Sequence, residues 1–356
     1  MQYSQLAQKA LEHFEKKLPF ALYSLPDSDE IIGIFQNSPT LHTSQLSQEN
    51  GFVFAPFNLE RGILQIPLEF SEVVNCKDVP TTINREGLAN IIEDEKDKKV
   101  HVALISKTIA KIKTAKAQKI VVSRKKEVPL QNFNFVKLCD SLFSKYSLAY
   151  RYIWYHPETA IWCGATPEVL IKTKGTSFST MALAGTQKVD GKSIIFWEQK
   201  EKSEQQWVVD AIVENLLDKT TALNISKTQT HIAGNLAHLR TDIRGEFTTN
   251  KHALKKVVET LHPTPAICGT PRKAAQLFIA VNETYDREFY TGFLGVTNSE
   301  VQQTQLFVNL RCVKIEGNLA TLYAGGGITE DSIPDAEWDE THNKLQTMAK
   351  VLQPLL

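Results

Sequence analysis

The chain has no excess of charge of either sign and no long apolar segment. Its 356 residues include 40 basic and 40 acidic side chains, a formal net charge of +0. A nucleic-acid-binding protein normally carries a basic excess, so this balance argues against one. No stretch approaches the roughly 20 apolar residues that a membrane-spanning helix requires. The first residues lack a basic segment followed by an apolar core, so we expect no secretory signal.

Cysteine is scarce, and its few positions form no pattern. The five cysteines are scattered, odd in number and never spaced as C-x-x-C: Cys76, Cys139, Cys163, Cys268 and Cys312. This predicts reduced, mostly buried thiols in a cytoplasmic protein. The sequence also lacks internal repeats and low-complexity linkers. Its 42% hydrophobic content is ordinary for a globular protein, and its length allows one large domain or two or three smaller ones.

Helical and β-like segments arrive in groups. A helix is predicted over 4–17, and the short apolar runs at 20–23, 31–35, 51–56 and 63–67 predict a meandering antiparallel sheet. The charged segment 93–99 indicates an exposed loop or helix face. Further helices are predicted over 101–117, 134–145, 197–218, 250–261 and 271–282, and strands over 119–124, 148–155, 159–163, 169–172, 178–183, 228–232, 238–243, 291–297, 303–315 and 319–324. This order favours an α+β fold over alternating βαβ units.

The stretch 322–344 is the most informative part of the chain. It starts as the end of an apolar strand and continues through Gly325, Gly326 and Gly327 into a loop and a helix. We expect the glycines to form a turn, because successive glycines let a backbone approach a ligand and direct its amides at an anion. A plain turn without a ligand is the ordinary alternative.

Two pairs of glutamates are placed to share helix faces. Glu337 and Glu340 are three residues apart, with Lys344 four residues further, and Glu201 and Glu204 repeat the spacing on an earlier helix. Residues three and four apart lie on one side of a helix. Two such pairs could meet at Mg2+, which takes few protein carboxylates and leaves positions for water and an anionic ligand. Two ordinary amphipathic helices with solvated faces would show the same spacing.

Several motifs occur together and in one order: GATPEVL at 164–170, ALAGT at 182–186, KEKSE at 200–204, LAHLRT at 236–241, LHPTPAICGTP at 261–271, DREFYTG at 286–292, NLRC at 309–312, and the stretch 322–344. In this set the sequence resembles the chorismate-utilising enzymes, the family of anthranilate synthase component I, aminodeoxychorismate synthase, salicylate synthase and isochorismate synthase. The resemblance covers residue 119 to the C-terminus, whereas residues 1–100 match weakly.

This resemblance implies the family's α+β architecture, with layered antiparallel β-sheets, helices packed outside and the active site in the central cleft. Residues 1–100 would form the N-terminal part of the β-rich fold. Residues 101–356 would form the chorismate-binding catalytic region, and the two would make one structural unit.

The resemblance also implies which nucleophile is used. Isochorismate and salicylate synthases keep a lysine at the position of Lys119 to activate water, and the ammonia-using members lack it. Aminodeoxychorismate synthases carry a nucleophilic lysine where this chain has Ala184. Glu168 matches the family's general acid. Together, Lys119 and Glu168 imply isochorismate synthase, which adds water to chorismate and expels its distal hydroxyl.

This chemistry sets requirements for both residues. Hydroxide is a poor leaving group, so Glu168 must stay neutral, with its pKa raised by burial. Water is a poor nucleophile, and Lys119 can activate it only if its pKa is lowered toward neutral by an apolar setting or nearby cations. A lysine at the start of a strand is ordinarily solvated, and a glutamate in a turn is ordinarily an exposed cap. From the sequence alone, both of these ordinary interpretations remain open.

By the same resemblance, Mg2+ would be held by Glu204 and Glu340, with Glu201 and Glu337 as outer or water-mediated partners. The substrate would contact Gly185, Thr186, His238, Ala266, Ile267, Tyr290, Arg311, Lys344 and the three glycines 325–327. Arg311 and the glycine amides would hold the enolpyruvyl carboxylate, and Lys344 would aid the carboxylate at the metal. His238 is also compatible with a core histidine.

One position departs from the family pattern. Gln205 stands where a histidine usually follows the glutamate, and a glutamine can donate a hydrogen bond but cannot carry charge. The chain also lacks the Leu-Leu-Glu-Ser element of feedback-inhibited anthranilate synthases, so tryptophan control is not expected.

No amidotransferase subunit is expected for a water-using member, and a monomer is compatible with the sequence, which leaves the oligomeric state open. Two alternatives stay open: a salicylate synthase, which eliminates pyruvate from isochorismate in the same site, and a non-catalytic chorismate- or metal-binding protein on this scaffold. Isochorismate could feed menaquinone or siderophore biosynthesis.

Overall fold

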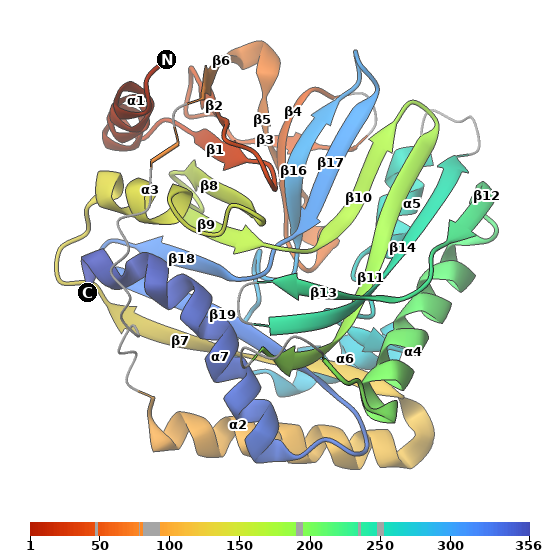
Figure 1. Cartoon of the computed structure of the whole chain (residues 1–356). Coiled ribbons are helices and arrows are strands. Elements are labelled where there is room, and N and C mark those ends of the chain that lie inside the picture. Colours follow the sequence, from red (N-terminus) through yellow and green to blue (C-terminus); the bar gives the residue numbers. More distant parts are fainter. Residues whose placement is uncertain (47–48, 78, 81–92, 190–194, 234–235, 248–252) are drawn as a thin grey trace.

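Two large antiparallel sheets form the centre of the molecule in the computed structural model (Figure 1). The structure describes residues 1–46, 49–77, 79–80, 93–189, 195–233, 236–247 and 253–356. In that part of the chain, sheet A has the order β15 (Gly269–Thr270), β7 (Lys119–Pro129), β19 (Leu319–Ile328), β18 (Cys312–Glu316), β9 (Ala160–Thr166), β8 (Tyr150–His156), β1 (Phe20–Ser24), β2 (Ile31–Gln36) and β6 (Ser71–Cys76).

Sheet B has the order β12 (Thr220–Ile225), β14 (Leu236–Phe247), β11 (Ser177–Lys188), β10 (Val169–Lys174), β17 (Gln303–Val308), β16 (Phe293–Asn298), β4 (Gly51–Ala55), β5 (Ile63–Pro67) and β3 (His42–Ser44), and β13 (Gln229–Ala233) also pairs with β14. The α-helices are α1 (Tyr3–Glu15), α2 (Glu95–Lys111), α3 (Phe135–Phe143), α4 (Gln199–Leu216), α5 (Ala253–Leu261), α6 (Arg272–Asn282) and α7 (Pro334–Leu352).

Aromatic side chains join the two sheets. Strands β1, β2, β8 and β9 of sheet A and β4, β5, β16 and β17 of sheet B contribute to one buried cluster between them. Its rings include Tyr150 stacked on Phe307 with centroids 4.1 Å apart, and Phe54 tilted against Trp154 at 5.0 Å. Large rings bury much apolar surface, and their packing adds a geometric preference. The cluster therefore fixes how the sheets face each other.

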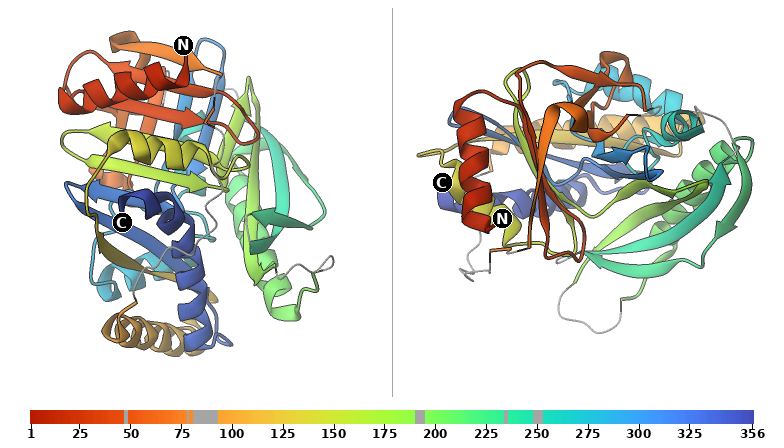
Figure 2. Two further views of the ribbon diagram at one scale, coloured as in Figure 1. Left: turned by 60° about the vertical axis from the view of Figure 1, so that its left-hand side comes forward. Right: turned by 90° about the horizontal axis from the view of Figure 1, so that it is seen from above.

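Helices cover the outer faces of the sheets. Side chains from α1, α3 and α7 pack on sheet A in one apolar cluster, and α4 and α5 pack on sheet B in another. Figure 2 shows α2 and α7 together at one end of the molecule, and the two helices are in contact. This layered α+β arrangement matches the architecture that the sequence implied.

The two helices that carry the predicted carboxylates begin with recognisable local signals. In α4 the carboxylate of Glu201 accepts a hydrogen bond from the backbone N–H of Glu198 at 3.1 Å, which satisfies a donor that the helix cannot use internally. In α7 Pro334 is the first helical residue, and Asp335 and Glu337 follow in the first turn. Proline suits that position because its missing N–H would have had no partner, and acidic residues there favour the helix dipole.

The N-terminal strands do not form one meandering sheet, and that prediction is wrong. Strands β1, β2 and β6 belong to sheet A, whereas β3, β4 and β5 belong to sheet B. Strand β1 pairs with β8, and β4 pairs with β16, far along the chain. Both strands are buried throughout. A continuous apolar run marks burial on both faces but does not encode which remote strand will pair with it.

The segment predicted as one strand over 303–315 is two strands in different sheets. Strand β17 ends at Val308 in sheet B, and β18 begins at Cys312 in sheet A. The chain crosses between the sheets at residues 309–311, where Arg311 adopts a left-handed conformation with φ 47°. Such a conformation is uncommon for a residue other than glycine and breaks an extended strand. The apolar pattern continues across this break and does not reveal it.

The expected turn through the three glycines is also wrong. Gly325, Gly326 and Gly327 lie inside β19 and pair with Ser123, Val122 and Val121 of β7. None of the three has a positive φ. Glycine allows a turn without requiring one, and here the long ladder with β7 keeps the chain extended.

Several other helices and strands differ in the structure from those predicted from the sequence. The charged segment forms the start of α2, where Asp94 accepts a hydrogen bond from the Lys96 N–H at 2.8 Å, and a π-helix, Ile112–Lys116, continues the helix. Four short strands, β3, β6, β12 and β15, were not expected. Residues 250–252 of a predicted helix, and residues 78 and 81–92 of the polar segment, lie outside the described residues.

The cysteines agree with the prediction, since all five are buried and none is in a disulfide. Of the helices that the structure describes, none combines the length and apolar character needed to cross a membrane.

We expect the N-terminal region and the rest of the chain to unfold together, because strands from residues 20–76 continue both sheets, through pairing of β1 with β8 and of β4 with β16. Far-ultraviolet circular dichroism and tryptophan fluorescence should give the same midpoint in urea. Two separated transitions would show that the regions are independent units.

Candidate active site

A pocket lies where the β7–β19 part of sheet A meets β11, β14 and helix α4. Helix α7 and the loops around residues 167, 266, 290 and 310 complete it. It is lined by Lys119, Val121, Pro167, Glu168, Leu183, Ala184, Gly185, Thr186, Lys200, Glu201, Glu204, His238, Ala266, Ile267, Tyr290, Thr291, Leu310, Arg311, Tyr323, Gly325, Gly327, Glu337, Glu340 and Lys344. These include every residue that the sequence assigned to the site except Gly326.

Lys119, the first residue of β7, is only 2% exposed. Its ammonium lies 2.8 Å from Oε1 of Glu204, which extends from α4. A side chain at Gly327 would collide with this pair, because its Cβ would lie 2.6 Å from Lys119 Cε and 3.0 Å from the Glu204 oxygen. The interpretation of Lys119 as a solvated strand end is therefore wrong, and the glycine provides space for the contact between the buried Lys119 and the partly buried Glu204. The apolar or cationic setting that a lysine base requires is not found at its ammonium, because the neighbouring group is a carboxylate.

Glu168 lies between β9 and β10 and is 4% exposed. Burial raises its pKa to about 7 from an ordinary value of 4.5, although the positive charges of Lys119, Arg311 and Lys344 act in the opposite direction. Removing a carboxylate from water disfavours its charged form. Glu168 thus carries its proton at slightly acidic pH, as a general acid must.

Glu337 and Glu340 have opposite pKa shifts although they are neighbours on α7. Burial, and then the charge of Glu340, raise the pKa of Glu337 to about 7. Burial alone would raise the pKa of Glu340 as well, but the nearby Lys344 outweighs it and the pKa falls. Lys344 Nζ lies 2.5 Å from Glu340 Oε1 and donates a hydrogen bond to the Gly325 carbonyl at 2.9 Å. Lys344 thereby ties α7 to β19.

The four carboxylates of the two helical pairs line this one pocket. Within the described residues, no group of three or more His, Cys, Asp or Glu side chains is arranged as a ready metal site. Each of Glu204 and Glu340 is instead paired with a lysine. Carboxylate oxygens are the donors that Mg2+ prefers, and this ion commonly uses one or two of them together with water and an anionic ligand. The donor set therefore fits Mg2+ bound through few protein ligands.

His238 offers a neutral ring to the pocket. Burial, followed by the charges of Arg311 and Lys344, lowers its pKa to about 3. Its Nδ1 lies 3.1 Å from the Gly185 carbonyl and 3.2 Å from Thr186 Oγ1. A neutral ring donating to that carbonyl leaves Nε2 as an acceptor. Nε2 is buried without a partner among the described residues, so it can accept a hydrogen bond from a ligand.

Two further parts of the wall depend on glycine. Gly185 has φ +65°, and its Cβ would lie 3.1 Å from Cβ of Glu201, so helix α4 can approach β11 closely only at a glycine. On the opposite side, a Cβ at Gly325 would lie 3.1 Å from the hydroxyl of Tyr290, whose ring stacks on that of Tyr323 at 5.3 Å. Ala266 and Ile267 continue this wall.

Arg311 brings a cation into the pocket from the crossing between the sheets. Burial lowers its pKa. The three lysines of the pocket each lie beside a glutamate, so Arg311 is the pocket cation that has no ion pair among the described residues, and it is suited to bind an anionic group.

A model of the chorismate binding enzyme family matches residues 58–353, most of the chain. The chain belongs to the family of chorismate binding enzymes. This agrees with the resemblance found in its motifs.

Isochorismate synthases are among the relatives. The chain is 30% identical to isochorismate synthase EntC of Escherichia coli over 258 residues, which are 70% of this chain and 66% of EntC. It is 34% identical to isochorismate synthase MenF of the same organism over 198 residues, 53% of this chain and 45% of MenF. The chain thus spans just under two thirds of EntC and less than half of MenF.

Solved structures extend the similarity over nearly the whole chain. The structure of DhbC from Bacillus anthracis, a proposed isochorismate synthase, has a TM-score of 0.80 at 26% identity, and covers 98% of this chain and 100% of that one. The Escherichia coli MenF structure has a TM-score of 0.78 at 22% identity, with 94% and 88% covered, which shows the shared fold. The α+β fold of the chorismate-utilising enzymes is confirmed.

Several pocket residues of this chorismate binding enzyme were not singled out from its sequence. They are Val121, Pro167, Leu183, Lys200, Thr291, Leu310 and Tyr323. The Nζ of Lys200 lies 3.6 Å from Glu337. Because Lys200 is the first residue of the KEKSE motif, the motif could have identified it as a pocket residue. The apolar members look like any other core residue in a sequence.

Gln205, the departure from the family pattern, does not line the pocket. Its Nε2 donates to the Ala182 carbonyl and to Thr241 Oγ1, both at 3.0 Å. These bonds attach α4 to β11 and β14. The residue therefore helps to hold the helix that carries Glu201 and Glu204, and it needs no charge to do so.

Replacing Glu168 with Gln should stabilise the protein at alkaline pH. The pKa of Glu168 is higher in the folded chain, so its ionisation destabilises the fold progressively as pH rises from about 4.5 to about 7. At pH 8.5 the free energy of unfolding of Glu168→Gln should exceed that of the wild type by roughly 3 kcal/mol, and near pH 4 the two should converge. Urea unfolding at both pH values in metal-free buffer checks this.

The matched control is Glu158→Gln, at an exposed position between β8 and β9. It should leave the pH dependence of unfolding unchanged. Equal pH dependence in Glu168→Gln and the wild type would contradict the raised pKa.

Proposed function

We propose that this protein is a Mg2+-dependent isochorismate synthase, an isomerase that adds water to chorismate and expels the distal hydroxyl. The observation that carries the proposal is that Lys119 and Glu168 are both buried and line one pocket that also contains cationic side chains and paired carboxylates. The similarity to EntC and MenF, which are named isochorismate synthases, supports the same reaction.

Lys119 would take a proton from the attacking water. It is held in place at the start of β7 by Glu204, and Gly327 leaves the space beside it. At the position where aminodeoxychorismate synthases have a nucleophilic lysine, Ala184 lines the pocket and offers no reactive group. Water is then the nucleophile, and the reaction needs no amidotransferase partner.

Glu168 would protonate the leaving hydroxyl. Its raised pKa keeps a proton available near neutral pH. The positioned carboxylic acid avoids release of free hydroxide, and general acid–base catalysis by such a group typically contributes about 10²–10⁴-fold to the rate. The pocket would thus supply a base, Lys119, for the addition of water and an acid, Glu168, for the departure of the hydroxyl group.

Chorismate carries two carboxylates, and the pocket offers cations for both. Arg311 would bind the enolpyruvyl carboxylate, and Lys344 would assist at the ring carboxylate. His238 Nε2 and the wall around Tyr290 would contact the uncharged parts of the ligand. The glycines 325–327 contribute space, since they are paired in β19 and form no turn.

Glu204 and Glu340 would hold Mg2+, with Glu201 and Glu337 acting through water. When bound, the ion supplies Lewis-acid stabilisation of negative charge on the ring carboxylate. Loss of the proton from Glu337, whose pKa is raised to about 7, would further favour a cation. We propose that the isochorismate formed feeds menaquinone or siderophore biosynthesis.

The test is incubation of the purified protein with chorismate and Mg2+, followed by chromatographic separation of the products. Isochorismate should accumulate without salicylate or pyruvate, and excess EDTA should abolish turnover until Mg2+ is restored. Salicylate with equimolar pyruvate would identify a salicylate synthase instead. Chorismate binding without any product would identify a non-catalytic binding protein.

Lys119 variants test the base directly. Lys119→Ala should lower kcat by about 10²–10⁴-fold while chorismate still binds. Lys119→Arg should be similarly inactive, because a guanidinium keeps the pairing with Glu204 but stays protonated. The control is Lys125→Ala, further along the same strand, which should keep wild-type kcat. Unchanged turnover in Lys119→Ala would refute the assigned base.

A further inference from the structure

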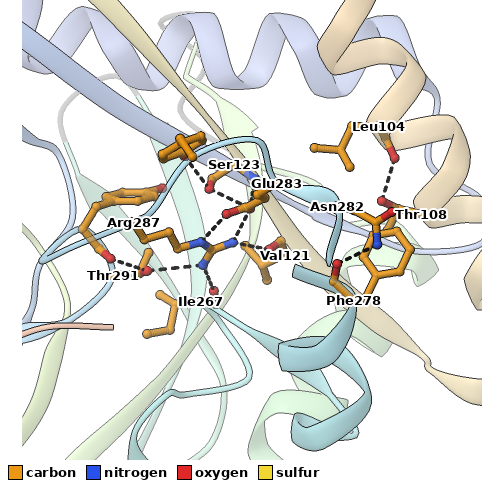
Figure 3. A network of polar contacts seen from close by, with 12 residues as sticks. Leu104, Thr108, Val121, Ser123, Ile267, Phe278, Asn282, Glu283, Arg287 and Thr291 are labelled. Atoms are coloured by element: carbon orange, nitrogen blue, oxygen red, sulfur yellow. Dashed lines mark hydrogen bonds and ion pairs between the residues drawn. The ribbon is translucent and has the colours of Figure 1, made fainter. Parts of the chain in front are cut away.

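A buried ion pair lies directly behind the pocket wall. Glu283, just after α6, and Arg287, four residues later, have side chains that are each 2% exposed. Arg287 Nη2 lies 2.6 Å from Glu283 Oε1, and Nε lies 2.8 Å from Oε2, so the contact is bidentate (Figure 3). Neither residue lines the pocket itself.

Arg287 uses all of its donors. Nη1 donates to the Ile267 carbonyl at 3.0 Å and to Thr291 Oγ1 at 3.2 Å, and Nη2 also donates to the Val121 carbonyl at 2.8 Å. With the two bonds to Glu283, these account for the five N–H groups of a guanidinium. The three groups beyond the ion pair come from separate segments of the chain, and Val121, Ile267 and Thr291 all line the pocket.

Glu283 holds the same strand as Arg287 does. Its Oε1 accepts hydrogen bonds from the Ser123 backbone N–H at 2.7 Å and from Ser123 Oγ at 2.8 Å. Strand β15 pairs with β7 at Lys119 and Ile120, and the Val121 N–H donates to the carbonyl of Cys268, just before β15, at 2.8 Å. The ion pair binds the next two backbone groups along this edge of β7, the Val121 carbonyl and the Ser123 N–H. It therefore continues the edge pairing where the neighbouring strand stops.

We propose that Glu283 and Arg287 are positioning residues for catalysis, which fix the start of β7, and hence Lys119, relative to the wall formed by Ile267 and Thr291. The proposal rests on the function assigned to Lys119 above. Thr291 Oγ1 in turn donates to the Tyr290 carbonyl at 2.6 Å, which extends the network to another pocket residue.

The ion pair is suited to positioning rather than to simple stabilisation. A buried ion pair contributes little net stability compared with apolar residues of similar size, because desolvation of the charges opposes their attraction. The planar, rigid fork of arginine can hold several acceptors at fixed directions, which lysine cannot. A displacement of about 1 Å in reacting groups can lower a rate by roughly 10²-fold. We therefore expect the pair of Glu283 and Arg287 to maintain the position of Lys119, the proposed base.

The effect should appear in kcat more than in KM. Arg311 and Lys344, which would bind the substrate carboxylates, make no contact with Arg287 or Glu283 among the hydrogen bonds and ion pairs of the described residues. Loss of the network should leave these binding groups in place while Lys119 loses its fixed position.

Arg287→Lys is the test variant, because it keeps a charge beside Glu283 but cannot reach all of the acceptors. Its kcat should fall at least about 10-fold, and its KM for chorismate should change less than about 3-fold. The matched control is Arg151→Lys. Arg151 is also 2% exposed and donates to the Phe143 carbonyl at 2.6 Å and to Ser24 Oγ at 2.7 Å, and none of these three residues lines the pocket. Its kcat should stay near the wild-type value.

All variants are assayed with Mg2+ at a temperature where circular dichroism shows them folded. If Arg287→Lys does not fold, Glu283→Asp serves instead, since it keeps the charge but shortens the reach to Ser123 and Arg287. Hydrogen exchange gives a readout that needs no turnover: the amides of residues 119–123 should exchange faster in either variant than in the wild type.

A wild-type kcat in the folded variants, or a loss no larger than that of Arg151→Lys, would overturn the proposal. A wild-type protein that does not convert chorismate would overturn the proposed function instead, and unchanged exchange at 119–123 would then decide against the positioning role independently.

Discussion

The ion pair between Lys119 and Glu204 connects the two halves of the site. Lys119 begins a strand of sheet A, and Glu204 extends from a helix that packs on sheet B, so their 2.8 Å contact spans the pocket. A charge removed from water is costly unless it is paired. Each residue therefore constrains the other, and the aromatic cluster joins the two sheets to which their elements belong or on which they pack.

The pocket gives different protonation states to identical side chains. Glu168 and Glu337 are driven toward the neutral form by burial, whereas the nearby lysine keeps Glu340 ionised. Burial also keeps His238 neutral. It lowers the pKa of His238, whereas it raises that of Glu168, because the charged form of histidine is a cation. The roles proposed for these residues, as acid, metal ligand and hydrogen-bond acceptor, thus depend on their surroundings and not on residue type.

The sequence allowed most of the site to be predicted but less of the fold. The motifs around Glu168, Glu204 and Glu340 are local, so their residues could be assigned from the resemblance to a known family, and the structure places them around one pocket. Strand partners could not be assigned, because the runs that became β1 and β4 are buried on both faces and pair with segments far along the chain. The run at 325–327 was misread because glycine permits a turn and a strand alike. Arg287 was visible in a motif, but its partners are backbone groups on three remote segments.

The left-handed residue at the passage between the sheets has a mechanical consequence. Arg311 belongs to the short connection that leaves β17 in one sheet and enters β18 in the other. A guanidinium anchored at such a crossover is carried by both layers at once, so any tilt of one layer against the other reorients it. An anion bound to Arg311 would contact both sheets through this residue. Its affinity and the angle between the sheets would therefore depend on each other.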